Sequence, residues 1–224
     1  MAQLKWDEVG KRGYETGVDH GVLYVADNSG AAGTTWGHGV AWNGLTTVTQ
    51  SPDGAEPTAI YADNIKYLNI LSIENFGATI EAYTYPDAFA ACDGSAELGS
   101  EGSGVSIDQQ ERKKFCFCYR TKVGTDLDPE AGYKLHIIYN CLAQPSERSY
   151  ETVNDSPSAI TFSWEVSTTP VDVTGMKPTA HLVIDSTKCV AAKLKLIEDK
   201  LYGTATEEPT VLMPDEIVNI LKSK

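Results

Sequence analysis

The chain has 224 residues, of which 42% are hydrophobic and 22% are charged. This composition excludes an intrinsically disordered chain, and the length allows one large domain or two small ones. No run approaches the roughly 20 consecutive apolar residues that span a bilayer, and the first residues show no secretory signal pattern. We therefore expect a protein that is made in the cytoplasm and has no membrane partner.

The chain is strongly acidic, with 31 acidic and 18 basic residues and a formal net charge of −13. Tight non-specific binding to nucleic acid depends on lysine and arginine displacing counterions from phosphates, so this charge argues against such binding. Net charge by itself says little about the fold. The negative charge is consistent with two interpretations. It keeps the protein soluble, or it prevents the surface from adhering to nucleic acid.

Most of the chain alternates between apolar and polar residues with the period of two that is typical of strands. Enrichment in Val, Ile, Thr, Tyr and Phe supports this interpretation. The predicted strands cover residues 39–49, 65–71, 77–84, 114–123, 133–141, 160–168 and 179–184. Gly, Pro, Asn and Asp separate them, and residues 50–59, 94–104 and 124–132 are predicted to be loops. The pattern predicts an antiparallel β-sandwich or barrel rather than a parallel nucleotide-binding sheet.

Helices are expected mainly near the C-terminus, apart from a short helical turn after Pro86. Ser186 is the predicted N-cap of a helix that ends at Tyr202, before Gly203. A second helix is predicted from Pro214 to Lys224, because proline favours the first helical turn and lysine the last. The expected organisation is a β domain over residues 1–203, followed by a linker and C-terminal helix over residues 204–224.

The cysteines give no indication of a metal or redox site. Cys116 and Cys118 would share one face of a strand, opposite to Phe115 and Phe117. Zinc sites usually need two such close pairs, and the other cysteines, Cys92, Cys141 and Cys189, do not form a second one. We expect free thiols that pack as small apolar side chains, and no metal.

The sequence contains no Walker loop, no dinucleotide-binding glycine motif, no HExxH motif and no GxSxG motif. A glycosidase pair can be drawn between Glu81 and Glu165, but the required separation of two carboxylates cannot be read from sequence. The four tryptophans are Trp6, Trp36, Trp42 and Trp164. They could form a sugar-binding face, although Trp is also common in cores and subunit interfaces. A carbohydrate-binding β-sandwich module therefore remains the alternative function.

An ordered series of short phrases carries more information than any single motif. In chain order they are WDEVGKR (6–12), ETGVD (15–19), GVLY (21–24), VAWNGLT (40–46), SPDGAEPT (51–58), YADNIKYL (61–68), EAYTYPD (81–87), CDGS (92–95), DSP (155–157), TFSWEVSTTP (161–170) and DSTK (185–188). Together they resemble the major tail proteins, or tail tube proteins, of long-tailed bacteriophages and prophages of Gram-positive bacteria. The resemblance covers about residues 5–203.

The resemblance implies a tail-tube β-sandwich or barrel with a flanking α-helix. It also implies hexameric rings of identical subunits that stack into a tube in the virion. Double-stranded DNA would pass through the lumen without specific binding, and the tape measure and tail terminator proteins would be further partners. On this interpretation the chain has no catalytic residue, no metal and no cofactor. An acidic lumen would then explain the net charge.

The family often uses a long loop between early strands as a contact arm between subunits. The polar stretch between Gln50 and Ala59 contains two prolines and a glycine, so it is the predicted arm. Its proposed contact residues are Ser51, Pro52, Asp53, Gly54, Ala55, Glu56, Pro57 and Thr58. The helix from Pro214 departs from the family pattern. It could decorate the tube, cover an edge of its own subunit, or be a frayed tail.

Overall fold

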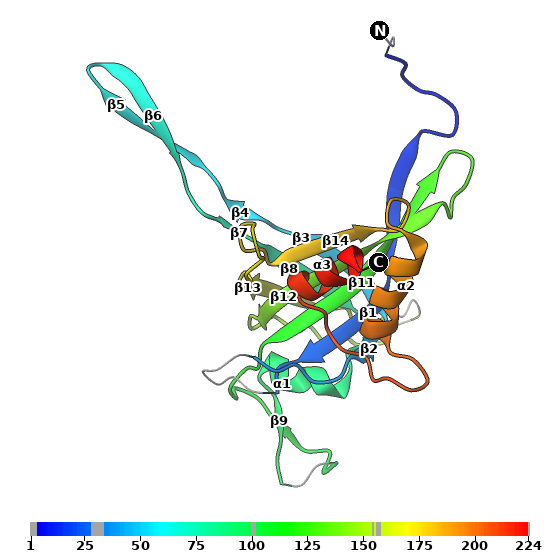
Figure 1. Ribbon diagram of the computed structural model, residues 1–224. Coiled ribbons are helices and arrows are strands. Elements are labelled where there is room, and N and C mark those ends of the chain that lie inside the picture. Colours follow the sequence, from blue (N-terminus) through cyan, green and yellow to red (C-terminus); the bar gives the residue numbers. More distant parts are fainter. Residues whose placement is uncertain (1–3, 28–33, 100–101, 154, 156–157, 224) are drawn as a thin grey trace.

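The computed structural model describes residues 4–27, 34–99, 102–153, 155 and 158–223. Residues 100–101, within one predicted loop, residues 156–157, within the DSP phrase, and Lys224, the predicted end of the last helix, lie outside this part. The chain is mainly β, as predicted, and its strands pair antiparallel (Figure 1). The strands are β1 (Gly13–Val25), β2 (Val40–Trp42), β3 (Leu45–Gln50), β4 (Asp53–Gly54), β5 (Pro57–Ala62), β6 (Ile65–Leu71), β7 (Glu74–Asn75), β8 (Gly77–Ala82), β9 (Ala96–Glu97), β10 (Ser106–Ile107), β11 (Phe115–Thr125), β12 (Gly132–Ala143), β13 (Phe162–Thr168) and β14 (His181–Asp185).

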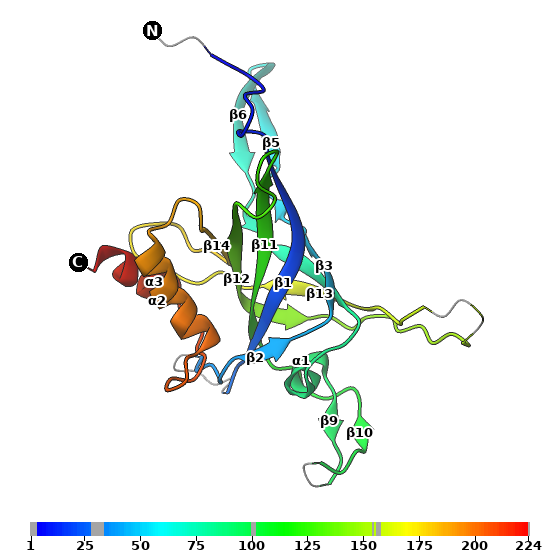
Figure 2. The same ribbon diagram turned by 90° about the vertical axis from the view of Figure 1, so that its right-hand side faces the viewer.

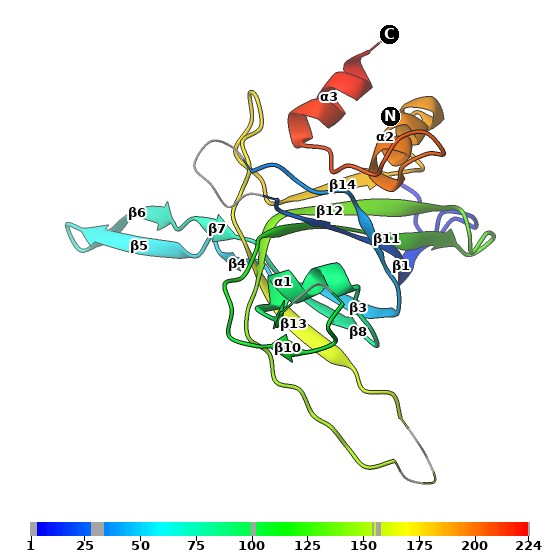
Figure 3. The same cartoon turned by 90° about the horizontal axis from the view of Figure 1, so that it is seen from below.

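One large sheet, in the order β2-β1-β11-β12-β13-β8-β3, forms the body of the molecule. Strand β12 pairs with β14 along one part of its length and with β13 along another. Its residues Lys134–Ile138 pair with β14, and Cys141–Ala143 pair with β13. Beyond this change of partner the sheet folds back, so that β13, β8 and β3 form a second layer (Figure 3). The result is the sandwich-like arrangement expected from the alternating pattern.

An aromatic core fills the space between the two layers. The Trp42 ring lies 4.6 Å from the Phe89 centroid and 5.5 Å from that of Trp164, in tilted and edge-on arrangements. Phe89 comes from the short helical turn η1 (Asp87–Phe89), which leads into α1 (Ala90–Asp93) as expected after Pro86. Aromatic pairs in such geometry contribute about 0.5–1.5 kcal/mol beyond simple burial. Two of the four tryptophans are therefore core residues.

A second core lies between the outer face of the sheet and two helices, α2 (Ala191–Tyr202) and α3 (Pro214–Lys222) (Figure 2). Cys116 and Cys118 point into it, whereas Phe115 and Phe117 point into the aromatic core. The predicted alternation in this strand is confirmed. Both faces of β11 are covered over residues 115–119, and this half of the strand is accordingly apolar on both sides.

The C-terminal segment packs on the body of its own chain. Val211, Leu212 and Ile217 are buried in the second core. The Tyr139 hydroxyl donates a hydrogen bond to the Leu212 carbonyl oxygen at 2.9 Å. Of the three roles considered for this segment, covering a surface of its own subunit describes it best, although the covered surface is a sheet face and not an edge.

Several predicted boundaries were wrong. The 13-residue strand β1 was missed because a bulge and positive backbone φ angles at Gly17 and His20 interrupt its alternation. The predicted strand 39–49 is two strands, separated at Gly44, where φ is +78°. Helix α2 starts at Ala191, because the Ser186 hydroxyl accepts a hydrogen bond from the Tyr133 backbone N–H instead of capping a helix.

Candidate subunit-contact arm

Residues 53–75 form a long hairpin, here called the arm, that projects from the body (Figures 1 and 3). Two short ladders build it. At its base β4 pairs with β7, and further out β5 pairs with β6. The predicted loop at 50–59 is therefore wrong, because residues 53–54 and 57–62 are strands.

Local sequence explains both the tip and the base of the arm. The tip is a two-residue turn of Asp63 and Asn64, whose φ angles are +51° and +63°. Such turns match the twist of a hairpin, and Asp and Asn tolerate this conformation better than most residues. At the base, Gly54 has φ +92°, and a Cβ atom there would lie 2.2 Å from the Ile73 carbonyl oxygen. Only glycine fits this position without a backbone shift.

The arm carries an unusual amount of exposed apolar surface. Tyr61 is 70% exposed and Ile73 is 83% exposed. Strand β6 is apolar on both faces, because its adjacent residues Ile70 and Leu71 point to opposite sides and both are exposed. Nearer the tip, a bulge at Tyr67 interrupts the alternation. The side chains of the arm that are more than half exposed and apolar are Tyr61, Ile65, Tyr67, Ile70, Leu71 and Ile73.

A hairpin of this kind is poorly stabilised by its own chain. Isolated two-stranded hairpins are marginally stable in water, and a strand that is apolar on both faces is typical of one buried on both sides. Contiguous exposed apolar surface on a projecting element is characteristic of a protein–protein contact. The arm therefore has the chemistry of an assembly element.

A stack of aromatic rings holds the base of the arm. Gln50, the last residue of β3, lies three positions before the arm, and Phe76 directly follows it. Phe76 stacks on His181 at 4.7 Å between centroids, His181 on His136 at 5.4 Å, and His136 on Tyr119 at 4.7 Å. The Gln50 side-chain amide donates a hydrogen bond to the Tyr119 hydroxyl at 2.8 Å. Both ends of the arm are thus fixed to β11, β12 and β14.

Burial favours the neutral form of both histidines in this stack. Burial, and then the neighbouring His136, lowers the pKa of His181 to about 4. Burial also lowers the pKa of His136; Glu15 opposes this shift and Lys134 adds to it. Sequence reasoning missed the pair, since 45 positions separate the two residues and neither lies in a motif. Only the pairing of β12 with β14 brings them together.

Six of the eight predicted contact residues lie on the first side of the arm, and the other two directly precede it. Ser51 and Pro52 precede β4, Asp53 and Gly54 form it, and Ala55 and Glu56 link it to Pro57 and Thr58 at the start of β5. Their role in subunit contact stays a prediction. Strand β6, whose sequence predicts an ordinary strand, returns along the second side of the arm and supplies most of its exposed large apolar side chains.

The glutamates and tryptophans considered for sugar hydrolysis or sugar binding lie outside the arm. Glu81 and Glu165 are diagonal neighbours on paired strands, since Glu81 faces Ser163 and Glu165 faces Thr79. Their side chains lie on the face opposite to the buried Trp164 and Ile80. With Trp42 and Trp164 buried, only Trp6 and Trp36 retain exposed surface, and Trp36 packs against the second core.

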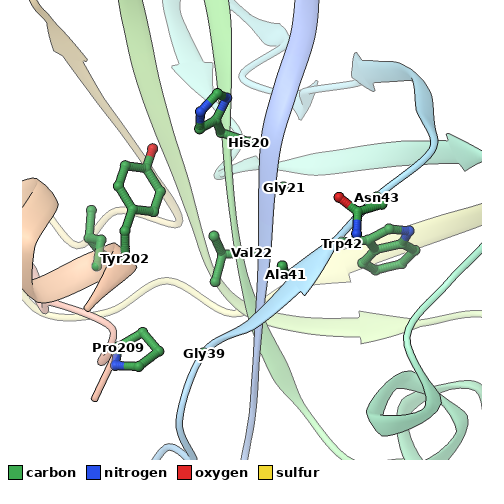
Figure 4. A pocket seen from close by; sticks show the side chains of 10 residues that line it. His20, Gly21, Val22, Gly39, Ala41, Trp42, Asn43, Tyr202 and Pro209 are labelled. Carbon is green, nitrogen blue, oxygen red and sulfur yellow. The ribbon is translucent and has the colours of Figure 1, made fainter. Parts of the chain in front are cut away.

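A hollow of about 410 Å³ lies between the β1–β2 edge and the end of α2 (Figure 4). His20 and Tyr202 face each other across it, with ring centroids 6.1 Å apart. His20 also contacts the Asp19 carboxylate at 2.9 Å. The residues that line this hollow include no Ser, Thr or Cys that could serve as a nucleophile beside the histidine.

Within the described ranges, no three His, Cys, Asp or Glu side chains are grouped so that they could hold a metal ion. No helix among the same residues has the length and apolar character needed to cross a membrane.

The sequence matches no protein-family profile and no curated protein. Among solved structures, it is similar to a chain of the anti-feeding prophage baseplate, with 7% identity, 83% of this chain and 99% of that chain covered, and a TM-score of 0.34. It is also similar to a chain of the sheath–tube complex of PVC, an extracellular contractile injection system, in the extended state. Here the identity is 10%, the coverage is 74% of this chain and 88% of the other, and the TM-score is 0.30. Neither TM-score is high enough to establish a common fold.

Proposed function

We propose that the chain is a structural protein of a phage tail, whose copies form hexameric rings that stack into the tail tube through which DNA is ejected. The observation that carries this proposal is the arm. It exposes apolar side chains on both faces and projects from a body whose own cores are already filled. Such an element is explained by contact with a further subunit.

The ordered phrases and the charge also support a tail tube. The phrases resemble tail tube proteins over most of the chain, and hexameric rings and stacking are taken from that resemblance. A net charge of −13 suits a conduit that must not retain DNA, because acidic side chains repel phosphates. On this proposal the subunits are virion components assembled in the host cytoplasm. They have no catalytic role, and their partners are one another, the tape measure and the tail terminator.

Electron microscopy of the purified protein at high concentration, with mass determination, tests the proposal. Rings or tubes with sixfold views are the expected result. A protein that stays monomeric at all concentrations, both alone and with the other tail proteins, would contradict it.

A matched variant isolates the contribution of the arm. Glu56 and Ser72 are hydrogen-bonded across its base, with the Glu56 N–H 3.0 Å from the Ser72 hydroxyl oxygen. Residues 57–71 can therefore be replaced by an Asn-Gly turn without strain on β4 and β7. The shortened chain should fold with unchanged thermal stability but form no rings. Normal rings from this variant would contradict the proposed role of the arm in ring formation.

A further inference from the structure

A second exposed apolar surface lies beside helix α3, outside the arm. It is a groove of about 820 Å³, here called the α3–β14 groove, between helix α3, strand β14 and the segment 171–179. Met176 is 78% exposed and Leu221 is 48% exposed. Its apolar lining includes Val173, Met176, Leu182, Val190, Ile217 and Leu221.

The groove is preformed by hydrogen bonds across it. The Asp215 carboxylate accepts one bond from the Thr174 backbone N–H at 2.9 Å and another from the Thr174 hydroxyl at 2.7 Å. Glu216 accepts a bond from the Met213 N–H at 2.7 Å, which caps the first turn of α3. Helix α3 and the segment 171–179 are therefore held together without an occupant. A rigid apolar recess of this kind loses little conformational entropy when a partner binds.

The charges at the groove differ in sign from those of the arm. Lys177 and Lys188 line the groove, with Asp185 as the acidic residue, and Lys188 lies 3.1 Å from the Asp185 carboxylate. Lys177 therefore leaves the groove with a net positive charge. The arm carries four acidic residues and one basic residue; these are Asp53, Glu56, Asp63, Glu74 and Lys66. Complementary charge favours encounter and orientation between two such surfaces.

We infer that the α3–β14 groove receives the apolar arm of a second copy of this chain. The inference rests on the proposed function and names the surface to which the arm binds. Within one chain the arm and α3 point in different directions (Figure 3), so each copy would offer its arm to one neighbour and its groove to another. Such head-to-tail contacts generate closed rings or stacked, filament-like assemblies.

Crosslinking between two cysteine variants of the full-length chain tests this contact. Both carry Cys189→Ser, which removes the thiol that lines the groove. The remaining native cysteines are buried. One chain carries Leu68→Cys on the arm and the other carries Met176→Cys at the groove. A short bismaleimide should join them in several-fold higher yield than it joins Leu68→Cys to Leu196→Cys. Leu196 is the matched control, because it is half exposed on α2 and lies outside the groove.

A second pair of variants tests the apolar contact itself. In the crosslinking assay, Leu221→Glu should lower the yield several-fold, whereas Leu196→Glu should leave it unchanged, because only the first places a charge in the groove. Equal yields for the groove and control cysteines would overturn the inference. Electron microscopy separates the two proposals. Rings without arm–groove crosslinks would contradict only the groove, and crosslinks without rings would contradict only the tube.

Discussion

The Nδ1 atom of His136 lies 3.2 Å from the Nε2 atom of His181, and the two rings are nearly parallel, at 7°. A hydrogen bond of this kind needs at least one unprotonated nitrogen, so two imidazolium rings cannot share it. Because Phe76 stacks on His181, the pair fixes one end of the arm to the body. The protonation state of the pair is therefore linked to the anchoring of the arm.

Stability should fall as the pH is lowered from about 6.5 to about 4. In the unfolded chain a histidine takes up a proton near pH 6.5, whereas His181 in the folded chain has a pKa of about 4. Between these values the unfolded state binds more protons, so its free energy falls relative to the folded state. Urea unfolding at several pH values should show this slope. His181→Gln should flatten it, whereas replacement of the exposed His38 by Gln should not. An equal slope in wild type and His181→Gln would contradict the prediction.

Gly54→Ala should disorder the arm while leaving the body intact. The added methyl group would lie 2.2 Å from the Ile73 carbonyl oxygen, in a backbone conformation with positive φ. We expect faster hydrogen exchange for the amides of residues 57–71 and little change elsewhere. Gly99→Ala is the matched control, because φ there is also positive, at +96°, but nothing lies within 4 Å of the added Cβ. Similar exchange in both variants would show that the close contact is unimportant.

Ile217→Ala should destabilise the whole domain by about 2–5 kcal/mol, because it leaves a cavity in the second core. Ile217 is 2% exposed, although it lies in the segment that sequence separates from the β domain. Thermal unfolding should remain a single transition at a lower Tm. Leu196→Ala, at a half-exposed position, should change the Tm far less. A separate early transition in Ile217→Ala would instead mean that residues 204–224 unfold independently.

Tyr139→Phe should lower the free energy of unfolding by about 1–3 kcal/mol, because it leaves the buried Leu212 carbonyl oxygen without its hydrogen-bond donor. The Tyr139 hydroxyl donates this bond at 2.9 Å. Urea unfolding measures the loss. Tyr67→Phe on the arm is the control, since the Tyr67 side chain is largely exposed. Equal stability of the two variants would show that the bond to Leu212 contributes nothing.

Glycans should not change the tryptophan fluorescence of this protein. Trp42 and Trp164 are buried in the aromatic core, where a sugar cannot reach them. Saturable, glycan-dependent quenching would favour the carbohydrate-binding alternative. If Trp6→Phe removed that quenching, the exposed Trp6 would be the contact.

Much of the fold was predictable because strand periodicity is a local property. Phe115, Cys116, Phe117 and Cys118 alternate between two buried faces as their spacing predicts. Strand β1 was not predictable in the same way, since its bulge near His20 breaks the period of two. Residues 51–58 are predicted to be a loop because Pro and Gly are frequent among them, whereas residues 53–54 and 57–58 lie in strands β4 and β5. Their role in subunit contact stays a prediction from the resemblance.

The amino-acid sequence thus established the mainly β class, the acidic charge and the helical C-terminus, all of which follow from composition and short-range pattern. Three-dimensional packing was needed for the rest. The pairing of β12 with β14 joins His136 to His181, and burial in the second core makes Ile217 part of the body. Strand β6 is predicted from its sequence as an ordinary strand, yet it lies exposed in a projecting hairpin. Exposure depends on what the rest of the chain covers, and a local pattern does not contain that information.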